Sequence, residues 1–227
     1  MKAVMRGLLV MLAGSISPVL AEENFDPAAA LEMHRQAQIN ADGTVTIGKL
    51  QWMRCSLGQR WVGDTCIGEP WEGSWLDAMS LPYLMNDQGG YAGHTDWRLP
   101  TIDELHTLVY CSSGEQRPRA LDTNGGPLYF REDIQDGRCE GSFERPTINT
   151  ELFPPPSEMF FSWSASETAP NSGQGWYVAF NDGFSSTPPV PGSHIGVRLV
   201  RSRSGQTTPC NGAVGGNGGT TGFVAPL

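Results

Sequence analysis

Hydrophobic and polar residues alternate early in the chain in a way that is typical of a β-hairpin followed by a further strand. Residues 40–43 (Asn-Ala-Asp-Gly) are a turn signal between Gln36–Ile39 and Thr44–Ile47, so the two flanking stretches predict a hairpin. Residues 50–54 (Leu-Gln-Trp-Met-Arg) also alternate and predict a strand that leads into Cys55.

Two helices are marked by the residues at which they start. Ser74 is followed three residues later by Asp77 and caps a first helix, which Pro82 should kink or end. Thr101 caps a second helix, with Glu104 as its capping-box partner. The expected buried stripes are Trp75, Ala78, Met79 and Tyr83 in the first helix, and Ile102, Leu105, Leu108 and Val109 in the second.

After Cys139 the pattern changes to short apolar stretches separated by turns. Residues 160–164, 175–180 and 195–201 predict strands, with a turn at residues 181–183 (Asn-Asp-Gly) after the second. Near the start, Asp26-Pro27 followed by alanines predicts a short helix or a loose arm. Helices early and strands late predict an α+β domain with two main helices and short antiparallel strands.

The first 21 residues have the three parts of a secretory signal. Lys2 and Arg6 form a basic start, residues 7–13 are apolar, and Val19-Leu20-Ala21 predicts cleavage before Glu22. The apolar run is much shorter than the roughly 20 residues that a spanning helix needs. We therefore expect an exported protein, in the periplasm, on the cell surface or released, with no membrane insertion.

The charge balance argues against nucleic acid as a partner. The chain has a net charge of −9, and removal of residues 1–21, which carry Lys2 and Arg6 and no acid, changes it to −11. Phosphate binding favours a basic stripe instead. A local basic cluster of Arg198, Arg201 and Arg203 remains a candidate for ligand contact.

Five cysteines in an exported chain indicate disulfides with one cysteine left over. Five choices of the odd cysteine and three pairings of the other four leave fifteen schemes. Spacing favours Cys55–Cys66 around a short glycine-containing loop and Cys111–Cys139 around a longer polar one. Cys210 is then unpaired or forms an intermolecular bond. Because there is no Cys-x-x-Cys and no histidine pair at ligand spacing, we expect no zinc.

Composition divides the expected mature chain into an arm, a domain and a tail. Residues 22–38 form the arm and residues 39–203 the domain, in which residues 112–138 are an insertion loop. Residues 204–227 are rich in Gly, Thr and Asn, which predicts a flexible tail.

Seven stretches, taken in order, resemble the C-terminal domain of the Legionella collagen-like protein (Lcl), a bacterial family long classed as a domain of unknown function. They are Asp42–Thr46, Trp52–Gln59, Gly90–Thr101, Glu104-Leu105, Ile148–Pro154, Trp163-Ser164 and Val197–Arg201. Each motif alone has low specificity, but their shared order over residues 39–203 is specific.

This resemblance implies a C-type-lectin-like fold, related to that of formylglycine-generating enzymes, and a role in surface recognition. The relative for which the family is named is an adhesin that binds sulfated polysaccharides. This chain has no Gly-x-y collagen stem, so the avidity of a trimer does not transfer to it. Its acidity also makes a sulfated ligand less natural.

Most of the seven tryptophans fit a core better than a sugar-binding surface. The expected core anchors, each within an apolar pattern, are Trp52, Trp75, Trp97, Trp163 and Trp176. Trp61 and Trp71 are better candidates for exposed contacts. Asp96 and Arg98 are interpreted as structural residues that fix the loop before the second helix.

Calcium and catalysis both have only partial motifs. Phe180-Asn181-Asp182 is similar to the calcium segment of sugar-binding C-type lectins, but Gly183 favours a plain turn and the partner segment of those lectins is missing. Asp122–Gly126 starts like a calcium loop without the distal glutamate. The chain also lacks a Gly-x-Ser-x-Gly motif and a reactive cysteine pair near the last strand. We therefore expect no enzymatic activity and no cofactor, with calcium as the alternative.

These observations together predict a secreted or cell-surface binding domain, similar to an adhesin, for a glycan or protein ligand. The alternatives are a periplasmic enzyme of unrecognised chemistry and a structural accessory of a surface appendage. The candidate ligand-binding residues are Arg60, Trp61, Asp182 and Arg198. The loops 166–175 and 181–192 are expected to line the same surface.

Overall fold

The computed structural model describes residues 27–117, 137–154, 161–187 and 194–203. The predicted signal peptide, the tail and Cys210 lie outside these residues, and so does most of the predicted insertion loop. The helices are α1 (Pro27–Arg35), α2 (Trp75–Asp87) and α3 (Ile102–His106). The strands are β1 (Gln38–Ile39), β2 (Thr44–Ile47), β3 (Leu50–Met53), β4 (Arg60–Val62), β5 (Thr65–Ile67), β6 (Phe161–Glu167), β7 (Gly175–Ala179), β8 (Ser185–Ser186) and β9 (Val200–Ser202).

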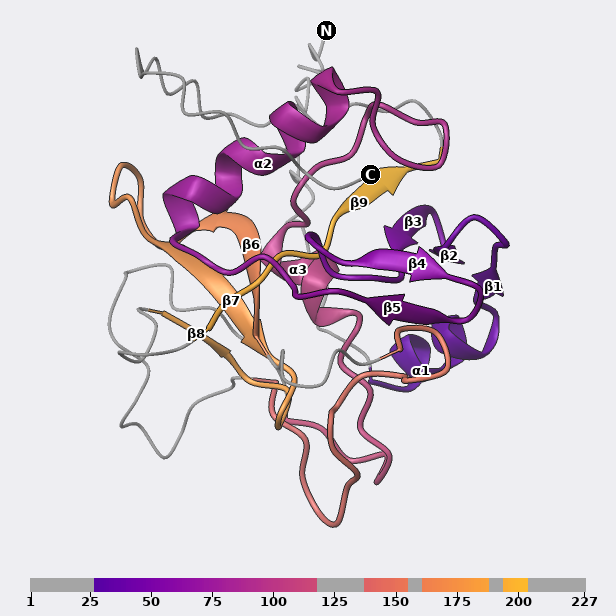
Figure 1. Cartoon of the computed structure of the whole chain (residues 1–227). Helices are drawn as coiled ribbons and strands as arrows, with labels where there is room; N and C mark the ends of the chain where they lie inside the picture. Colours follow the sequence, from indigo (N-terminus) through magenta and orange to yellow (C-terminus); the bar gives the residue numbers. More distant parts are fainter. Residues whose placement is uncertain (1–26, 118–136, 155–160, 188–193, 204–227) are drawn as a thin grey trace, which may run out of the picture.

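The predicted first hairpin and the strand after it form most of a four-stranded antiparallel sheet, in the order β1-β2-β3-β9. Asp42 holds the turn, because its Oδ1 accepts hydrogen bonds from both the backbone nitrogen and the hydroxyl of Thr44. β9 pairs with β3, so the end of the domain returns beside its beginning (Figure 1).

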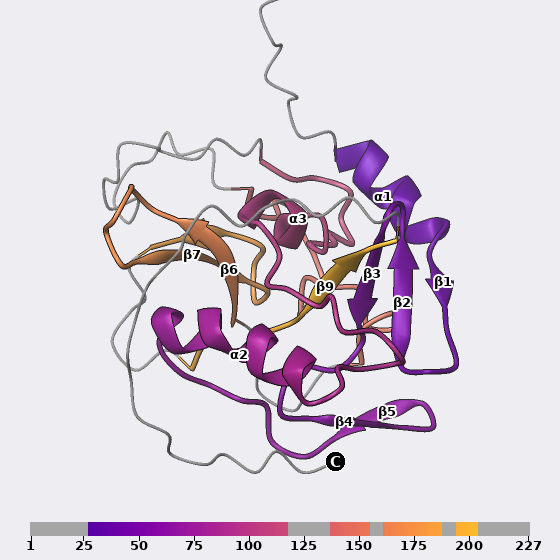
Figure 2. The ribbon, with the colours of Figure 1, turned by 90° about the horizontal axis from the view of Figure 1, so that it is seen from above.

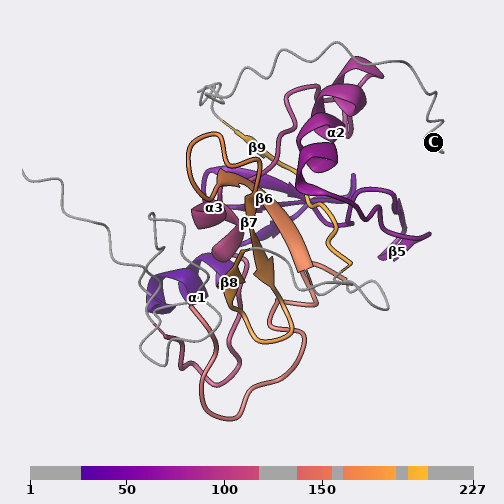
Figure 3. The same ribbon diagram turned by 90° about the vertical axis from the view of Figure 1, so that its left-hand side faces the viewer.

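The closing strand is shorter than the predicted range of 195–201, because this segment serves two sheets. Only Val200–Ser202 pairs with β3. Gly196 instead forms a parallel bridge with Ser162 of β6, which belongs to the three-stranded sheet β6-β7-β8. The segment therefore connects the two sheets (Figure 3).

α2 begins where the sequence predicts, with the Ser74 hydroxyl accepting a hydrogen bond from the backbone of Asp77. Trp75 and Ala78 are buried as expected, but the helix continues through Pro82 to Asp87 instead of ending. The expectation that Tyr83 is buried is wrong, since its side chain is 66% exposed. Pro82 takes the inward position, and Tyr83, the next residue, is turned about 100° away from it around the helix axis, toward solvent.

α3 has the predicted capping box between Thr101 and Glu104. The helix ends at His106, earlier than the apolar pattern suggested. The expected inner-face residues are nevertheless all buried, the last two beyond the helix: Ile102, Leu105, Leu108 and Val109.

The core has two parts, and β7 lies between them. Trp176, Val178 and Phe180 pack in one part, whereas the alternate residues Tyr177 and Ala179 pack in the other. This division follows from the alternation of side chains along a strand. The tryptophans predicted as core anchors are all buried, namely Trp52, Trp75, Trp97, Trp163 and Trp176.

Both predicted disulfides are present, Cys55–Cys66 and Cys111–Cys139. With small helices and antiparallel sheets, they confirm a disulfide-stabilised α+β domain. Within the described residues, no helix has the length and apolar character needed to span a bilayer.

Two buried histidines should make the domain sensitive to mild acid. His106 is fully buried, and its Nε2 lies 3.1 Å from the carbonyl oxygen of Gly183. Burial lowers the pKa of His106 to about 4 and also lowers the pKa of His34. The histidines take up protons at higher pH in the unfolded state than in the folded state. The free energy of unfolding therefore has its full value above about pH 6.5 and decreases as the pH falls toward 4. For His106 the full loss is about 3 kcal/mol.

This loss is measured by urea unfolding at a series of pH values. His106→Gln should lower stability at neutral pH and remove much of the decrease between pH 6.5 and 4. His94→Gln, a change at a partly exposed position, serves as the control. An unchanged pH slope in His106→Gln would contradict the assignment.

Candidate functional site

The β4–β5 hairpin stands apart from the two larger sheets as a two-stranded sheet of its own. Gly63, with φ at 67°, and Asp64 form its tight turn. Figure 2 draws it on the same side of the molecule as α2, and Figure 3 agrees. A two-stranded hairpin is at best marginally stable alone, so its anchoring to the domain decides whether it can present a surface.

The register divides the hairpin into an outer and an inner face. Arg60 pairs with Ile67, and Val62 pairs with Thr65, so these four side chains share one face. We call this the outer face, because all four residues are exposed. Val62 is 41% exposed and Ile67 40%. The remaining pair, Trp61 and Cys66, lies on the inner face.

Trp61 on the inner face packs against the body of the domain. The guanidinium carbon of Arg54 lies 4.2 Å from the centroid of its ring. Gly43 makes a close approach possible, because a Cβ there would lie 2.6 Å from Cγ of Trp61 and 2.3 Å from the hydroxyl of Tyr91. The Tyr91 hydroxyl in turn donates a hydrogen bond to the carbonyl of Asp42.

Trp61 and Arg60 therefore do not form the joint contact that their adjacency in sequence suggested. Successive residues of a strand point to opposite faces, which places the Arg60 guanidinium outward and the Trp61 ring inward. Trp61 is only partly exposed, as is Trp71, the other tryptophan that sequence reasoning proposed for exposed contacts.

The neck of the hairpin is held by one covalent bond and by backbone hydrogen bonds. Cys66 is bonded to the buried Cys55, which directly follows the Leu50–Arg54 stretch. The backbone nitrogen of Trp71 donates to the carbonyl of Leu57, and that of Leu57 donates to Val197 in the closing segment. The hairpin is thus anchored to the two ends of the domain at once.

Arg198 is not a surface residue, and we do not retain it as a ligand contact. Only 4% of it is exposed, and its guanidinium donates hydrogen bonds to the carbonyl oxygens of Met53 (3.0 Å) and Arg54 and to the Ser56 hydroxyl (3.4 Å). It also lies 4.9 Å above the ring of Phe153. Burial lowers the pKa of Arg198 to about 9.

Arg54 is a second buried arginine whose guanidinium donates to backbone carbonyls. Its Nε donates to the carbonyl of Leu152 at 2.7 Å, and its terminal nitrogen donates to that of Glu151 at 2.6 Å. Burial is the main reason why the pKa of Arg54 is lowered. Arg54 and Arg198 together tie three segments: the end of β3, the turn at 149–153, and the closing segment.

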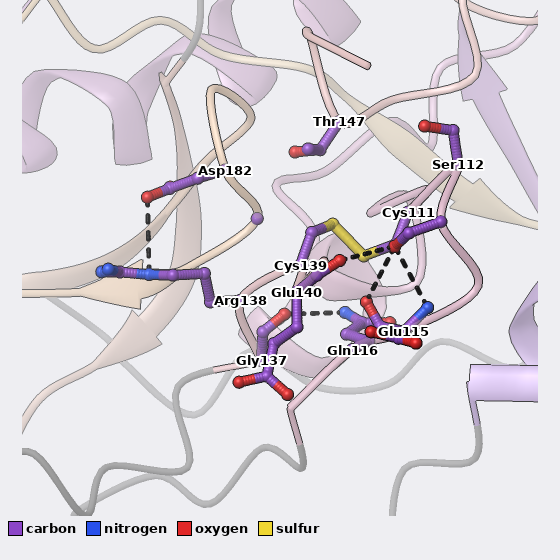
Figure 4. The surroundings of a disulfide bond; sticks show 12 residues. Cys111, Ser112, Glu115, Gln116, Gly137, Arg138, Cys139, Glu140, Thr147 and Asp182 are labelled. Atoms are coloured by element: carbon purple, nitrogen blue, oxygen red, sulfur yellow. Dashed lines mark hydrogen bonds and ion pairs between the residues drawn. A yellow bond between two sulfur atoms is a disulfide. The ribbon is translucent and has the colours of Figure 1, made fainter. Parts of the chain in front are cut away.

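Asp182 lies elsewhere, near the Cys111–Cys139 disulfide at the neck of the insertion (Figure 4). Its carboxylate is 3.4 Å from Nε of Arg138, and its backbone carbonyl accepts a hydrogen bond from Cys139. The carboxylate is largely buried and already paired, so Asp182 belongs to the structure of this neck.

The other charged candidates are also engaged in ion pairs. Arg98 binds Glu104 at 2.7 Å, as the structural interpretation expected. Asp96 accepts hydrogen bonds from Arg201 at 2.7 and 3.2 Å, and the hydrogen bond from Arg201 is the main reason why its pKa is lowered. The expected cluster of Arg198, Arg201 and Arg203 is therefore dispersed, with only Arg203 exposed.

The described residues contain no group of three His, Cys, Asp or Glu side chains that could hold a metal ion. The partial calcium motif at Asp122–Gly126 lies outside them.

Sequence reasoning missed the outer face of the hairpin, although its signal was available. The Gly63-Asp64 turn fixes the register, and the alternation then places Val62 and Ile67 beside Arg60. The candidate site is accordingly the outer face formed by Arg60, Val62, Thr65 and Ile67.

A family model described as the Lcl C-terminal domain matches residues 45–201, which is more than half of the chain. This range contains the hairpin, both disulfides and both buried arginines. No curated protein and no solved structure matches the chain.

Substitutions on the two faces of the hairpin should differ in how much they destabilise the domain. Trp61→Ala removes the stacking with Arg54 and the packing on Gly43, and should destabilise the domain by about 2 kcal/mol. Val62→Ala, on the outer face of the same strand, should cost less than about 0.5 kcal/mol. Urea unfolding without reductant measures both. Equal losses would contradict the assignment of the faces.

Replacing Arg198 with lysine should destabilise the domain by about 3 kcal/mol despite the retained charge. A single ammonium group cannot satisfy the separate acceptors on Met53, Arg54 and Ser56, and each unsatisfied buried acceptor is costly. Arg203→Lys, at an exposed position of the same segment, is the matched control and should be neutral. If Arg198→Lys were as stable as the control, the guanidinium would not be essential.

Proposed function

Because this chain belongs to the Lcl C-terminal domain family, we propose that it is an exported binding domain that recognises a protein ligand through the outer face of the β4–β5 hairpin. One observation carries the proposal: a disulfide-anchored hairpin presents two aliphatic side chains and an arginine to solvent. Val62 and Ile67 are each about two-fifths exposed, and Arg60 lies beside Ile67. An apolar centre with arginine at its margin is typical of protein interfaces.

The orientation of the aromatic residues favours a protein over a glycan. Sugar recognition commonly uses an exposed aromatic ring as a stacking surface, and Trp61 was the sequence candidate for this role. Its ring lies on the inner face, with the Arg54 guanidinium 4.2 Å from its centroid. The outer face offers aliphatic groups, one hydroxyl and one guanidinium, which suit the side chains and backbone of a polypeptide.

Two features support export and the proposed C-type-lectin-like architecture. Disulfides persist in oxidising compartments, and this domain has two. The N-terminal strands β2 and β3 pair with the closing strand β9, and the hairpin projects between the first strands and α2. Such an arrangement leaves a loop-borne surface on a rigid scaffold, which is where recognition usually resides.

The proposal is tested on arrays of extracellular-matrix proteins and of sulfated and neutral glycans, with and without calcium. We expect the purified chain to bind protein spots. The double variant Val62→Ser/Ile67→Ser should lose about tenfold or more in affinity, because central apolar contacts dominate such interfaces. Arg60→Ala should weaken binding less and change its salt dependence.

The control is Ile39→Ser, which removes a side chain that is 54% exposed on the edge strand β1. It should leave binding unchanged, and all variants should keep the melting temperature of the parent. Binding to glycans alone would refute the ligand class. Protein binding that survives Val62→Ser/Ile67→Ser would instead refute the surface.

A further inference from the structure

Three of the four most exposed large apolar side chains of the described residues lie on α2, and the fourth is Ile39 on β1. Leu76 is 60% exposed, Tyr83 66% and Leu84 53%. At 100° per residue these three positions fall within an arc of about 100° on one side of the helix, opposite the buried Trp75, Ala78 and Pro82. We call this stripe the α2 outer face. An exposed stripe of this kind indicates a contact surface.

A second copy of the chain is a poor occupant for this surface. α2 carries Asp77 and Asp87 and no basic residue, so two such helices packed together would bring acid close to acid. Three side chains also offer far less area than the roughly 800 Å² that each partner buries in a stable complex. A short segment that is already tethered nearby requires much less contact area, because its effective concentration is about millimolar.

We propose that the α2 outer face binds residues 223–227 of the same chain, Phe-Val-Ala-Pro-Leu. Phe223, Val224 and Leu227 are an apolar group that follows a long polar and glycine-rich stretch. They match the surface in kind and in number, three apolar side chains against three. Residues 204–227 contain no charged side chain, so no side chain of this segment is repelled by Asp77 or Asp87.

The path of the chain brings this segment within reach. β9 ends at Ser202, and Val200 is bridged to Arg98. The neighbouring Trp97 exchanges hydrogen bonds with Asn86, near the C-terminal end of α2. Figure 1 accordingly draws the end of β9 and the loop after α2 in the same upper part of the molecule.

The length of the connection also fits. Nineteen residues lie between Arg203 and Phe223. A flexible glycine-rich linker of that length has a root-mean-square span of about 25 Å. The stripe from Leu76 to Leu84 extends only about 12 Å along the helix. The linker therefore covers the distance without strain and is short enough to keep the local concentration of the segment high.

The test is photo-crosslinking of the full chain with Phe223 replaced by p-benzoylphenylalanine, at low micromolar protein concentration. We expect a crosslink within one chain, mapped by mass spectrometry to the peptide that contains Trp75–Asp87. The double change Leu76→Ser/Leu84→Ser should lower the yield about tenfold, because it removes two of the three apolar contacts. Both positions are exposed, so these changes should not unfold the domain.

The matched control is Val62→Ser/Ile67→Ser, which removes the apolar side chains of the hairpin and should leave the yield unchanged. Three results would each overturn the proposal: no crosslink, a crosslink that maps elsewhere, and crosslinked dimers whose yield rises with concentration. The binding arrays for the hairpin are independent of all three, so this inference and the proposed function can fail separately.

Discussion

The hydrogen bonds of the buried Arg198 guanidinium are the interaction on which the rest of this domain depends. The guanidinium is buried, has no carboxylate partner among the described residues, and is satisfied by backbone carbonyls at the end of β3 and by a serine hydroxyl. A buried cation is tolerated only when hydrogen bonds replace its hydration. Because those acceptors lie on the β3 segment and Arg198 on the closing segment, the charge can be satisfied only when the two ends of the domain have come together.

Arg54 ties the end of β3 to the middle of the chain in the same way, through hydrogen bonds to backbone carbonyls. It donates to the carbonyls of Glu151 and Leu152, and Phe153 next to them lies beneath Arg198. Segments more than 90 residues apart are thus locked by two side chains. The hairpin is attached where these ties converge, through Cys55 and Leu57. Its position is therefore fixed even though it shares no sheet with the rest of the domain.

Local signals made much of this fold predictable. The Asn40–Gly43 turn, the caps at Ser74 and Thr101, and both disulfide spacings are properties of short stretches, and all were confirmed. Where the sequence misled, the cause lay in tertiary contacts. Arg198 looked like part of a basic surface cluster, and its burial follows from acceptors more than 140 residues away in the chain.

The candidate site shows the same division between local and long-range information. Side-chain alternation around Gly63-Asp64 was sufficient to separate Arg60 from Trp61. Which of the two faces pointed inward depended on Gly43 and Arg54, and spacing alone could not show this. Tyr83 was misplaced for a similar reason, because Pro82 rather than Tyr83 fills the inward position on α2.

The Cys111–Cys139 bond marks a place where the domain can tolerate insertions. It holds the two ends of the intervening segment with their Cα atoms 5.4 Å apart, and Cys139 is buried in the core. The geometry at the exit is therefore independent of what lies between. Doubling the length of a closed loop costs only about 0.6 kcal/mol, so evolution or an engineer can lengthen, shorten or replace the residues between Arg117 and Gly137 while the core remains unchanged.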